Sequence, residues 1–289
     1  MTTGGGLPRV SVVMPVYNHE IFVERAIRSV AAQSGVDVEL ILIDDGSTDD
    51  SFAIARKVTS EVMPSARLIR RPNKGAHQTI NEGLRLASGD FLTILNSDDV
   101  FLDGRLKTCA QALRSHNAHF VFTGVEFYDE ADEVVANDPY VEDIRQATRT
   151  IDEFATLGFA LLKSNLAITT GNFFFSRELY RTVGGFRHYR YVHDWDFLLR
   201  VLFEYEPIYV PTPLYGYRVH GSNTFRSLAD VVGYETSEVM RNCMHRLTTR
   251  RPPNQKAPSR LTWPGAFDRF VERWGYQGYM PRGYHASSQ

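Results

Sequence analysis

The sequence predicts an α/β fold with a mostly parallel, Rossmann-like central sheet flanked by helices. Four short apolar runs alternate with helical patterns between residues 10 and 95. This alternation is typical of parallel strands joined by right-handed crossovers, with helices on both faces of the sheet. Acidic clusters directly follow two of the apolar runs, at the strand ends where an open α/β sheet binds its ligands. The 289 residues and the 43% hydrophobic content allow a substantial core.

Each strand in this first part is predicted from an apolar run, and each helix from apolar residues that repeat on one face. Strands are expected at residues 10–16, 39–43, 66–70 and 90–95, with helices at residues 21–33, 47–58 and 75–86 between them. Gly35 is expected to end the first helix, because glycine readily adopts a positive φ. Ser47 or Thr48 is the expected cap of the second helix.

The pattern is less regular after Phe101. Expected here are helices at residues 104–116, 176–183, 194–205 and 228–250, strands at 118–128 and 207–213, an exposed hairpin tip at 129–133 and a mixed region at 138–170. The predicted organisation is a flexible lead at residues 1–8, one domain at 9–225 and a C-terminal helical extension at 226–289.

Composition argues against several classes of protein. The formal net charge of −2 argues against a nucleic-acid-binding protein. The longest apolar run, residues 166–175, is shorter than the roughly 20 residues that a membrane-spanning helix requires. Cys109 and Cys243 have no metal-ligand spacing and are interpreted as reduced thiols. Because residues 1–6 lack the basic and apolar regions of a secretory leader, we expect a cytoplasmic location.

The C-terminal part differs in charge from the rest of the chain. Residues 241–289 contain nine Lys or Arg against two Asp or Glu, with seven large aromatic residues among them. This composition suits peripheral contact with an anionic membrane surface, at the inner face of the cell membrane. Packing of the aromatic residues against the rest of the protein is the favoured interpretation, because they show no clean amphipathic period.

Seven short motifs follow one another in the chain. They are residues 12–18 (VVMPVYN), 43–49 (IDDGSTD), 73–75 (NKG), 97–99 (SDD), 184–186 (GGF), 193–196 (HDWD) and 217–220 (YRVH). Through these motifs, residues 10–224 resemble the family 2 glycosyltransferases, which are inverting enzymes of the GT-A fold. The resemblance implies a nucleotide-binding half at residues 9–100 and a smaller, mixed acceptor-binding half at residues 101–225.

The resemblance places the nucleotide site at the ends of the first two strands. Pro15, Tyr17 and Asn18 would border the base. Asp44 or Asp45 would accept hydrogen bonds from the base or the ribose, since an ionised carboxylate is a pure acceptor. Capping of the following helix is the alternative role of these aspartates. The predicted nucleotide-binding residues are Pro15, Tyr17, Asn18, Asp44, Asp45, Lys74 and Asp98.

Asp98 and Asp99 match the metal motif of the family and are predicted, together with His220, to hold Mn²⁺ or Mg²⁺. The family motif has aspartate where this chain has Asn96, so the site carries one negative charge fewer. A divalent cation stabilises the charge that develops on a departing nucleoside diphosphate, and imidazole among the ligands slightly favours Mn²⁺. A loop histidine bonded to the backbone is the alternative interpretation of His220.

Asp194 is the predicted general base, which removes the proton of the acceptor hydroxyl during transfer. Capping of the following helix is a compatible role, and Asp196 is the second candidate. His193 stands where the family pattern has glutamate. The predicted acceptor-binding residues are Gly171, Asn172, His193 and Trp195.

The resemblance therefore implies an inverting, metal-dependent glycosyltransferase. Its partners would be a nucleoside-diphosphate sugar, with UDP favoured, and a saccharide or lipid-linked saccharide acceptor, in the synthesis of a cell-envelope polysaccharide. One alternative is a non-catalytic protein that binds a nucleotide sugar, which the departures at Asn96 and His193 leave open. A sugar-phosphate nucleotidyltransferase is less favoured, because no glycine-rich basic loop follows the first strand. The oligomeric state is left open.

Overall fold

The computed structural model describes residues 6–221 and 229–284, which fall into two compact units. The first unit comprises Met1–Val135, Thr169–His188 and Ile208–His220, and the second comprises Ala136–Ile168, Tyr189–Pro207 and Gly221–Gln289. Neither unit is a continuous segment of the chain. The predicted boundary between residues 225 and 226, and most of the predicted lead, lie outside the described residues, so the predicted division of the chain stays a prediction.

An eight-stranded sheet forms the centre of the first unit. Its strands are β1 (Arg9–Val16), β2 (Asp37–Asp44), β3 (Arg67–Arg70), β4 (Phe91–Ile94), β5 (Val100–Phe101), β6 (Phe120–Tyr128), β7 (Phe174–Ser176) and β8 (Ile208–Arg218). The order across the sheet is β3-β2-β1-β4-β7-β6-β8-β5. The neighbours from β3 to β4 are parallel, and so are β6 and β8, whereas β7 and β5 pair antiparallel. The predicted α/β class is confirmed.

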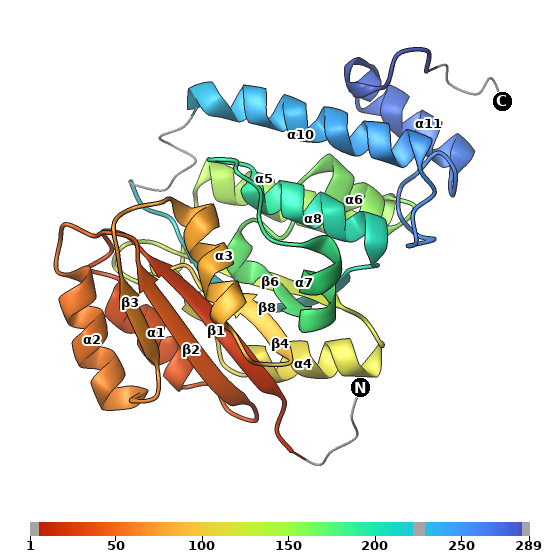
Figure 1. Ribbon diagram of the computed structural model, residues 1–289. Coiled ribbons are helices and arrows are strands. Elements are labelled where there is room, and N and C mark those ends of the chain that lie inside the picture. The colour runs from red at the N-terminus through yellow and green to blue at the C-terminus, as the bar shows by residue number, and fades with distance from the viewer. Residues whose placement is uncertain (1–5, 222–228, 285–289) are drawn as a thin grey trace. The chain divides into compact units, whose positions relative to one another are not determined.

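The helices of the first unit flank this sheet. They are α1 (Val23–Ala31), α2 (Ser51–Val62), α3 (Ala76–Leu86), α4 (Arg105–Ser115) and α7 (Arg177–Val183), with a 3-10 turn η2 (Thr170–Asn172). Helices α1 and α2 lie on one face of strands β1 to β3, and α3 lies on the other face (Figure 1). Because both faces are covered, β1 is mostly apolar, and Val10, Val12 and Val13 are fully buried. Each such side chain stabilises the fold by roughly 1.5–3 kcal/mol.

The parallel pairing brings the strand ends to one edge of the sheet. In the register of the pair, Val16 at the end of β1 lies opposite Asp44 at the end of β2. Val13 of β1 lies opposite Ile94, the last residue of β4. The polar turns that follow β1, β2 and β4 therefore share this edge, as the sequence predicts.

The start of the second helix was predicted wrongly. Helix α2 begins at Ser51, after Asp50, and not at Ser47 or Thr48. The hydroxyl of Ser47 accepts a hydrogen bond from the backbone N–H of Asn18 (3.0 Å), and the N–H of Thr48 donates to Oδ1 of Asn18 (2.8 Å). These groups link the turns after β1 and β2, so they are not used to cap a helix.

The second half of the sheet also differs from the prediction. Strand β8 continues to Arg218, beyond the expected end at Pro213. Strands β5 and β7 were not predicted, because two and three residues are too few to show a period. The expected hairpin tip at residues 129–133 is confirmed by the hydrogen bond from the N–H of Asp129 to the carbonyl of Glu133 (2.9 Å).

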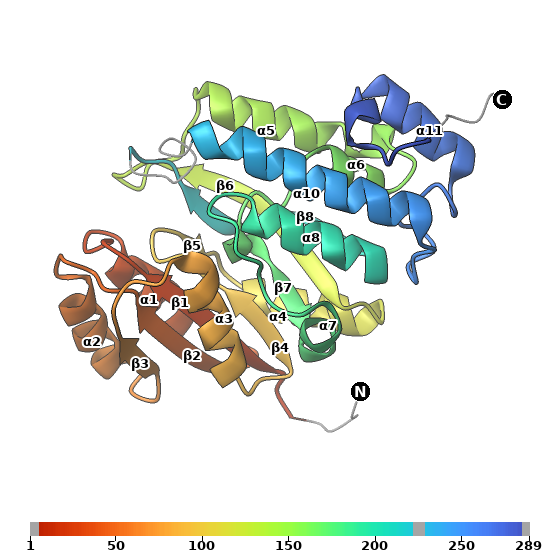
Figure 2. The same cartoon turned by 45° about the horizontal axis from the view of Figure 1, so that its top comes forward.

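The second unit is helical. Its elements are α5 (Pro139–Arg149), η1 (Ile151–Glu153), α6 (Leu157–Lys163), α8 (His193–Glu204), α10 (Ala229–Thr249), α11 (Pro264–Arg273) and η3 (Tyr276–Tyr279). Helix α10 runs alongside α8 (Figure 2). An ion pair between Arg246 and Glu204 (2.6 Å) joins these two helices. Among the described residues, no helix combines the length and the apolar character needed to cross a bilayer.

The aromatic residues of the C-terminal part have packing partners inside the second unit. Trp274 stacks on Phe154, with ring centroids 6.0 Å apart, and Trp263 lies edge-on to Phe159 at 6.3 Å. Phe267 is fully buried. These contacts are of the kind that the packing interpretation of the tail predicts.

Candidate functional site

Asp44 has one carboxylate oxygen to which none of the described residues donates a hydrogen bond. Its Oδ1 accepts a hydrogen bond from the backbone N–H of Ser47 (3.2 Å) and lies 3.4 Å from Nε of Arg70. Its Oδ2 is buried and has no hydrogen-bond partner among the residues that the structure describes. Buried polar atoms are rarely left unbonded. An unbonded acceptor at the end of β2 therefore suits a ligand that supplies an N–H or O–H donor.

Asp45 is used to hold the segment before α3. Its carboxylate accepts hydrogen bonds from the backbone N–H groups of Lys74 (2.8 Å) and Gly75 (2.9 Å), and it pairs with the guanidinium of Arg71. Arg71 also bonds to Glu82 at 2.8 Å. Asp45 thus positions the backbone of Lys74 at the same sheet edge, and both oxygens of Asp45 are occupied.

Tyr17 and Asn18 occupy the turn directly after β1. Asn18 adopts a left-handed backbone conformation, with φ of 53°, which asparagine tolerates better than most residues. The bonds of Asn18 to Ser47 and Thr48 fix this turn against the turn after β2. Tyr17 is 47% exposed, so its ring is accessible at the surface. Pro15 lies within β1, next to this turn.

Asp99 anchors the turn after β4 to strand β8. Its carboxylate accepts hydrogen bonds from the hydroxyl of Tyr215 (2.6 Å), the backbone N–H of Arg218 (2.8 Å) and the amide of Asn96 (3.0 Å). Burial, together with the neighbouring charge of Asp98, raises the pKa of Asp99 well above its usual value, against the opposing effect of these hydrogen bonds. Both oxygens of this predicted metal ligand are therefore engaged by the protein.

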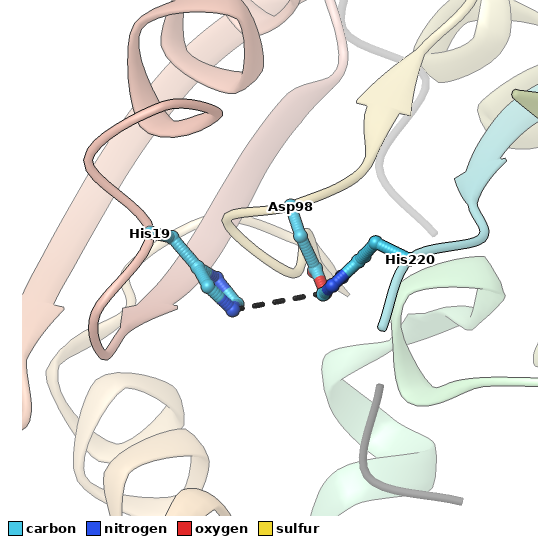
Figure 3. Close-up of side chains that lie close together, drawn as sticks. All are labelled: His19, Asp98 and His220. Atoms are coloured by element: carbon cyan, nitrogen blue, oxygen red, sulfur yellow. Dashed lines mark hydrogen bonds and ion pairs between the residues drawn. The ribbon is translucent and has the colours of Figure 1, made fainter. Parts of the chain in front are cut away.

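Asp98, in contrast, points toward two histidines (Figure 3). Its Oδ2 lies 3.0 Å from Nε2 of His220 and 3.8 Å from Nε2 of His19. One ligand atom from each of these residues lies within 4.8 Å of the others, which makes the group a candidate metal site. The structure thus brings together two predicted ligands, Asp98 and His220, with a third residue that the sequence did not single out.

Asp98 is the charged member of this group. Burial raises the pKa of this carboxyl, but the charges of His19 and His220 and the hydrogen bond from His220 outweigh it, so the pKa lies below its usual value. Asp98 is therefore an anion at neutral pH. Two imidazole nitrogens and one carboxylate oxygen form a donor set that divalent metals accept.

The predicted acceptor residues of the first unit are buried. Gly171 and Asn172 lie in η2, and Asn172 has no exposed surface. The amide oxygen of Asn172 accepts hydrogen bonds from Nη1 of Arg105 (3.1 Å) and from the backbone N–H of Thr123 (3.1 Å). A side chain at Gly171 would meet the hydroxyl of Tyr215. Their acceptor-binding role stays a prediction, and the contacts shown here are internal.

Asp194 lies in the first turn of α8, in the second unit. Its Oδ2 accepts a hydrogen bond from the amide of Asn165 (2.8 Å), and its Oδ1 accepts one from the backbone N–H of Trp195 (2.7 Å). Burial raises the pKa of Asp194 to about 7 in spite of these bonds. Asp196 is instead paired with Arg200 (2.9 Å). A pKa of about 7 is that of a group that exchanges a proton at neutral pH, so Asp194 has the acidity that a general base needs.

Glu235 of α10 holds the backbone just before Asp194. Its carboxylate accepts hydrogen bonds from the N–H groups of Arg190 (2.8 Å), Tyr191 (2.8 Å) and Val192 (3.3 Å). The sequence offers no signal for this contact, because a single glutamate in a long helical pattern reads as a surface residue. His193 is the first residue of α8 and follows this fixed segment directly.

Trp195 is held by the same unit. Its indole N–H donates to the carbonyl of Leu161 in α6 (3.0 Å). The two predicted acceptor residues of the second unit, His193 and Trp195, therefore flank Asp194 in the first turn of α8.

The fold is that of the GT-A glycosyltransferases. TarS of S. aureus in complex with UDP-GlcNAc matches with a TM-score of 0.66 at 17% sequence identity, covering 94% of this chain and 82% of that chain. The mannosyltransferase PcManGT from Pyrobaculum calidifontis, in complex with GDP-Man and Mn²⁺, matches with a TM-score of 0.65 at 18% identity, covering 94% and 74%. At these identities the likeness concerns the fold alone.

Residues 11–184 match the family model described as glycosyl transferase family 2. The chain therefore belongs to this family. The GalNAc(5)-diNAcBac-PP-undecaprenol beta-1,3-glucosyltransferase of Campylobacter jejuni is 33% identical over 114 residues, which cover 39% of this chain and 37% of that protein. The chain spans between about two fifths and about two thirds of the length of the first curated relatives that it matches.

Proposed function

We propose that the protein is an inverting glycosyltransferase that moves a sugar from a nucleoside-diphosphate sugar to a hydroxyl of a saccharide or lipid-linked saccharide. One observation carries the proposal. The sheet edge that bears the unbonded Oδ2 of Asp44 also bears the group of His19, Asp98 and His220. Both features suit a nucleoside diphosphate, which offers donors on its base and ribose and needs a counter-charge for its phosphates. Membership of family 2 supports sugar transfer.

The nucleotide is proposed to bind across the turns after β1 and β2. The exposed ring of Tyr17 would stack on the base, beside Pro15 and Asn18. Oδ2 of Asp44 would accept a hydrogen bond from a base N–H or a ribose hydroxyl, and Lys74 would lie toward the phosphates. UDP is the favoured nucleotide, supported by the complex of the fold relative TarS with UDP-GlcNAc.

Mn²⁺ or Mg²⁺ is the proposed cofactor, held by Asp98 and His220. When bound, such a cation supplies a Lewis acid for the diphosphate that leaves the sugar. The chain contributes a preformed anion at Asp98 and an imidazole nitrogen 3.0 Å away. The complex of the fold relative PcManGT with GDP-Man and Mn²⁺ supports this assignment.

Asp194 is proposed to take the proton of the acceptor hydroxyl as its oxygen attacks the anomeric carbon. A carboxylate whose pKa lies at about 7 is deprotonated often enough at neutral pH, and is basic enough, to do so. Direct attack by the acceptor oxygen inverts the anomeric configuration. The acceptor class is proposed from the Campylobacter relative, whose name specifies an undecaprenol-linked saccharide. We propose the synthesis of a cell-envelope polysaccharide as the setting of the reaction.

The proposed donor site is tested by calorimetric titration of UDP, GDP and dTDP, each with Mn²⁺ or with EDTA. We expect UDP to bind in a metal-dependent manner and Asp44→Asn to weaken binding about 10- to 100-fold, since one charge-assisted hydrogen bond is lost. Asp50→Asn, an exposed aspartate before α2, is the matched control. Failure of all three nucleotides to bind, with no transfer from a broad donor panel, would contradict the proposal. Nucleotide binding without any transfer would indicate a non-catalytic binding protein.

Glu235→Gln is expected to lower kcat about 10- to 100-fold with little change in the KM of the donor. The amide nitrogen of glutamine would face backbone N–H groups, so the segment before Asp194 would shift, and small misplacements of a catalytic group are costly. Steady-state kinetics measure the split between kcat and KM. Glu238→Gln is the control. Glu238 lies on the same helix, α10, but accepts a hydrogen bond from a side chain, the hydroxyl of Tyr189. Equal losses in both variants would argue against a positioning role for Glu235.

A further inference from the structure

We infer that His19 is a third metal ligand, and that the group of His19, Asp98 and His220 binds one Mn²⁺-type cation before any nucleotide arrives and in preference to Mg²⁺. The inference rests on the proposed function only in that the cation would serve the donor diphosphate. It makes a separate statement about this chain, namely that three protein side chains suffice to load the metal.

The spacing of the three ligand atoms supports a shared cation. Two ligands at right angles, each about 2.1 Å from a metal, are about 3.0 Å apart. Oδ2 of Asp98 lies 3.0 Å from Nε2 of His220 and 3.8 Å from Nε2 of His19. A cation between the three atoms would therefore require only a small movement of His19. Figure 3 shows the side chains converging from three separate segments.

His19 is held with its Nε2 directed at Asp98. Its other ring nitrogen, Nδ1, lies 2.8 Å from the hydroxyl of Ser97. Such a bond from the second ring nitrogen is the usual support of a metal-binding histidine. Phe22 packs against both imidazoles, with ring centroids 6.0 Å from His19 and 5.0 Å from His220. These contacts orient the two imidazole ligands in the protein without nucleotide.

The donor set determines which cation is preferred. Mg²⁺ favours oxygen ligands and retains most of its waters, so a site with one carboxylate binds it weakly. Imidazole nitrogen binds first-row transition metals. The affinity of such a site increases along the row from Mn²⁺ to Cu²⁺. A site with Asp98 alone would depend on phosphate oxygens to hold either cation. With His19 and His220 added, the protein supplies three ligands, of which two disfavour Mg²⁺.

The inference is tested by electron paramagnetic resonance of Mn²⁺ titrated into the full chain without nucleotide, since the signal of free Mn²⁺ decreases as the cation binds. We expect one site per chain, which a hundredfold excess of Mg²⁺ does not empty. His19→Ala should weaken Mn²⁺ binding at least about tenfold, because even loss of an outer partner of a ligand typically costs 10- to 100-fold. Ser97→Ala should give a smaller loss.

Controls separate the ligand role from folding and from the proposed function. His116→Ala removes an exposed histidine outside the group and should change nothing. His19→Gln preserves bulk, and circular dichroism confirms that each variant is folded. Wild-type Mn²⁺ affinity in folded His19→Ala and His19→Gln would overturn the inference. Mn²⁺ binding that requires UDP would also overturn it, and would leave the proposed function standing. Nucleotide-free Mn²⁺ binding without sugar transfer would support the inference and count against the proposed function.

Discussion

Asp194→Asn is expected to lower kcat for sugar transfer by about 10³-fold while donor binding stays unchanged. Asparagine has nearly the shape of aspartate but cannot accept the proton of the acceptor hydroxyl, and a positioned general base typically contributes 10²- to 10⁴-fold. Steady-state kinetics with the best donor of the panel measure the loss, and calorimetry measures donor binding. Asp152→Asn, which changes an exposed aspartate of η1 in the same unit, is the matched control.

The pH dependence of wild-type kcat/KM gives a second readout of the same role. Burial raises the pKa of Asp194 to about 7. The carboxyl is then increasingly protonated below pH 7, so kcat/KM should fall about tenfold per pH unit on the acid side. Asn165→Ala removes a hydrogen bond that favours the charged form of Asp194. The pKa of Asp194 should therefore rise, and the acid-side decrease in kcat/KM should move to higher pH. A decrease in kcat/KM that begins only below pH 5, or one whose position Asn165→Ala leaves unchanged, would argue against Asp194 as the base.

Asp98→Asn is expected to reduce metal-dependent UDP binding to the level seen with EDTA and to lower kcat/KM about 10²- to 10³-fold. The variant removes the only anion among the three candidate ligand side chains, and a metal supplies several kcal/mol of charge stabilisation to a departing diphosphate. Calorimetry with Mn²⁺ and with EDTA measures the binding, and initial rates measure the transfer. Residual metal-dependent binding equal to wild type would show that another residue holds the cation.

The neighbouring residue provides the control for this experiment. Asp99→Asn should retain metal-dependent binding and should lower the free energy of unfolding by about 1–3 kcal/mol, because an amide cannot satisfy the donors of Tyr215, Arg218 and Asn96 equally. Urea denaturation measures this loss. If Asp99→Asn instead abolished metal-dependent binding at unchanged stability, Asp99 and not Asp98 would be the ligand, as the metal motif alone allows.

Local patterns predicted most of the first part of the fold. The apolar runs at β1, β2 and β4 and the helical stripes between them depend only on residues close in sequence. The edge that carries Asp44 and Asp98 followed from the rule that parallel strands end together. The start of α2 could not be predicted in this way. Ser47 and Thr48 are suitable caps by residue type, but their bonds to Asn18 reach across about thirty residues.

Residue patterns and motifs were enough to predict the class of fold, the polar sheet edge and the candidates Asp98, His220 and Asp194. How neighbouring residues divide their roles became visible in the folded protein. Asp98 and Asp99 are alike in sequence, yet one faces His220, 122 residues away, and the other is bonded to Tyr215. His19 and Glu235 were missed for the same physical reason. A side chain acquires its partners from packing between distant segments, whereas a sequence pattern reports only the residues beside it.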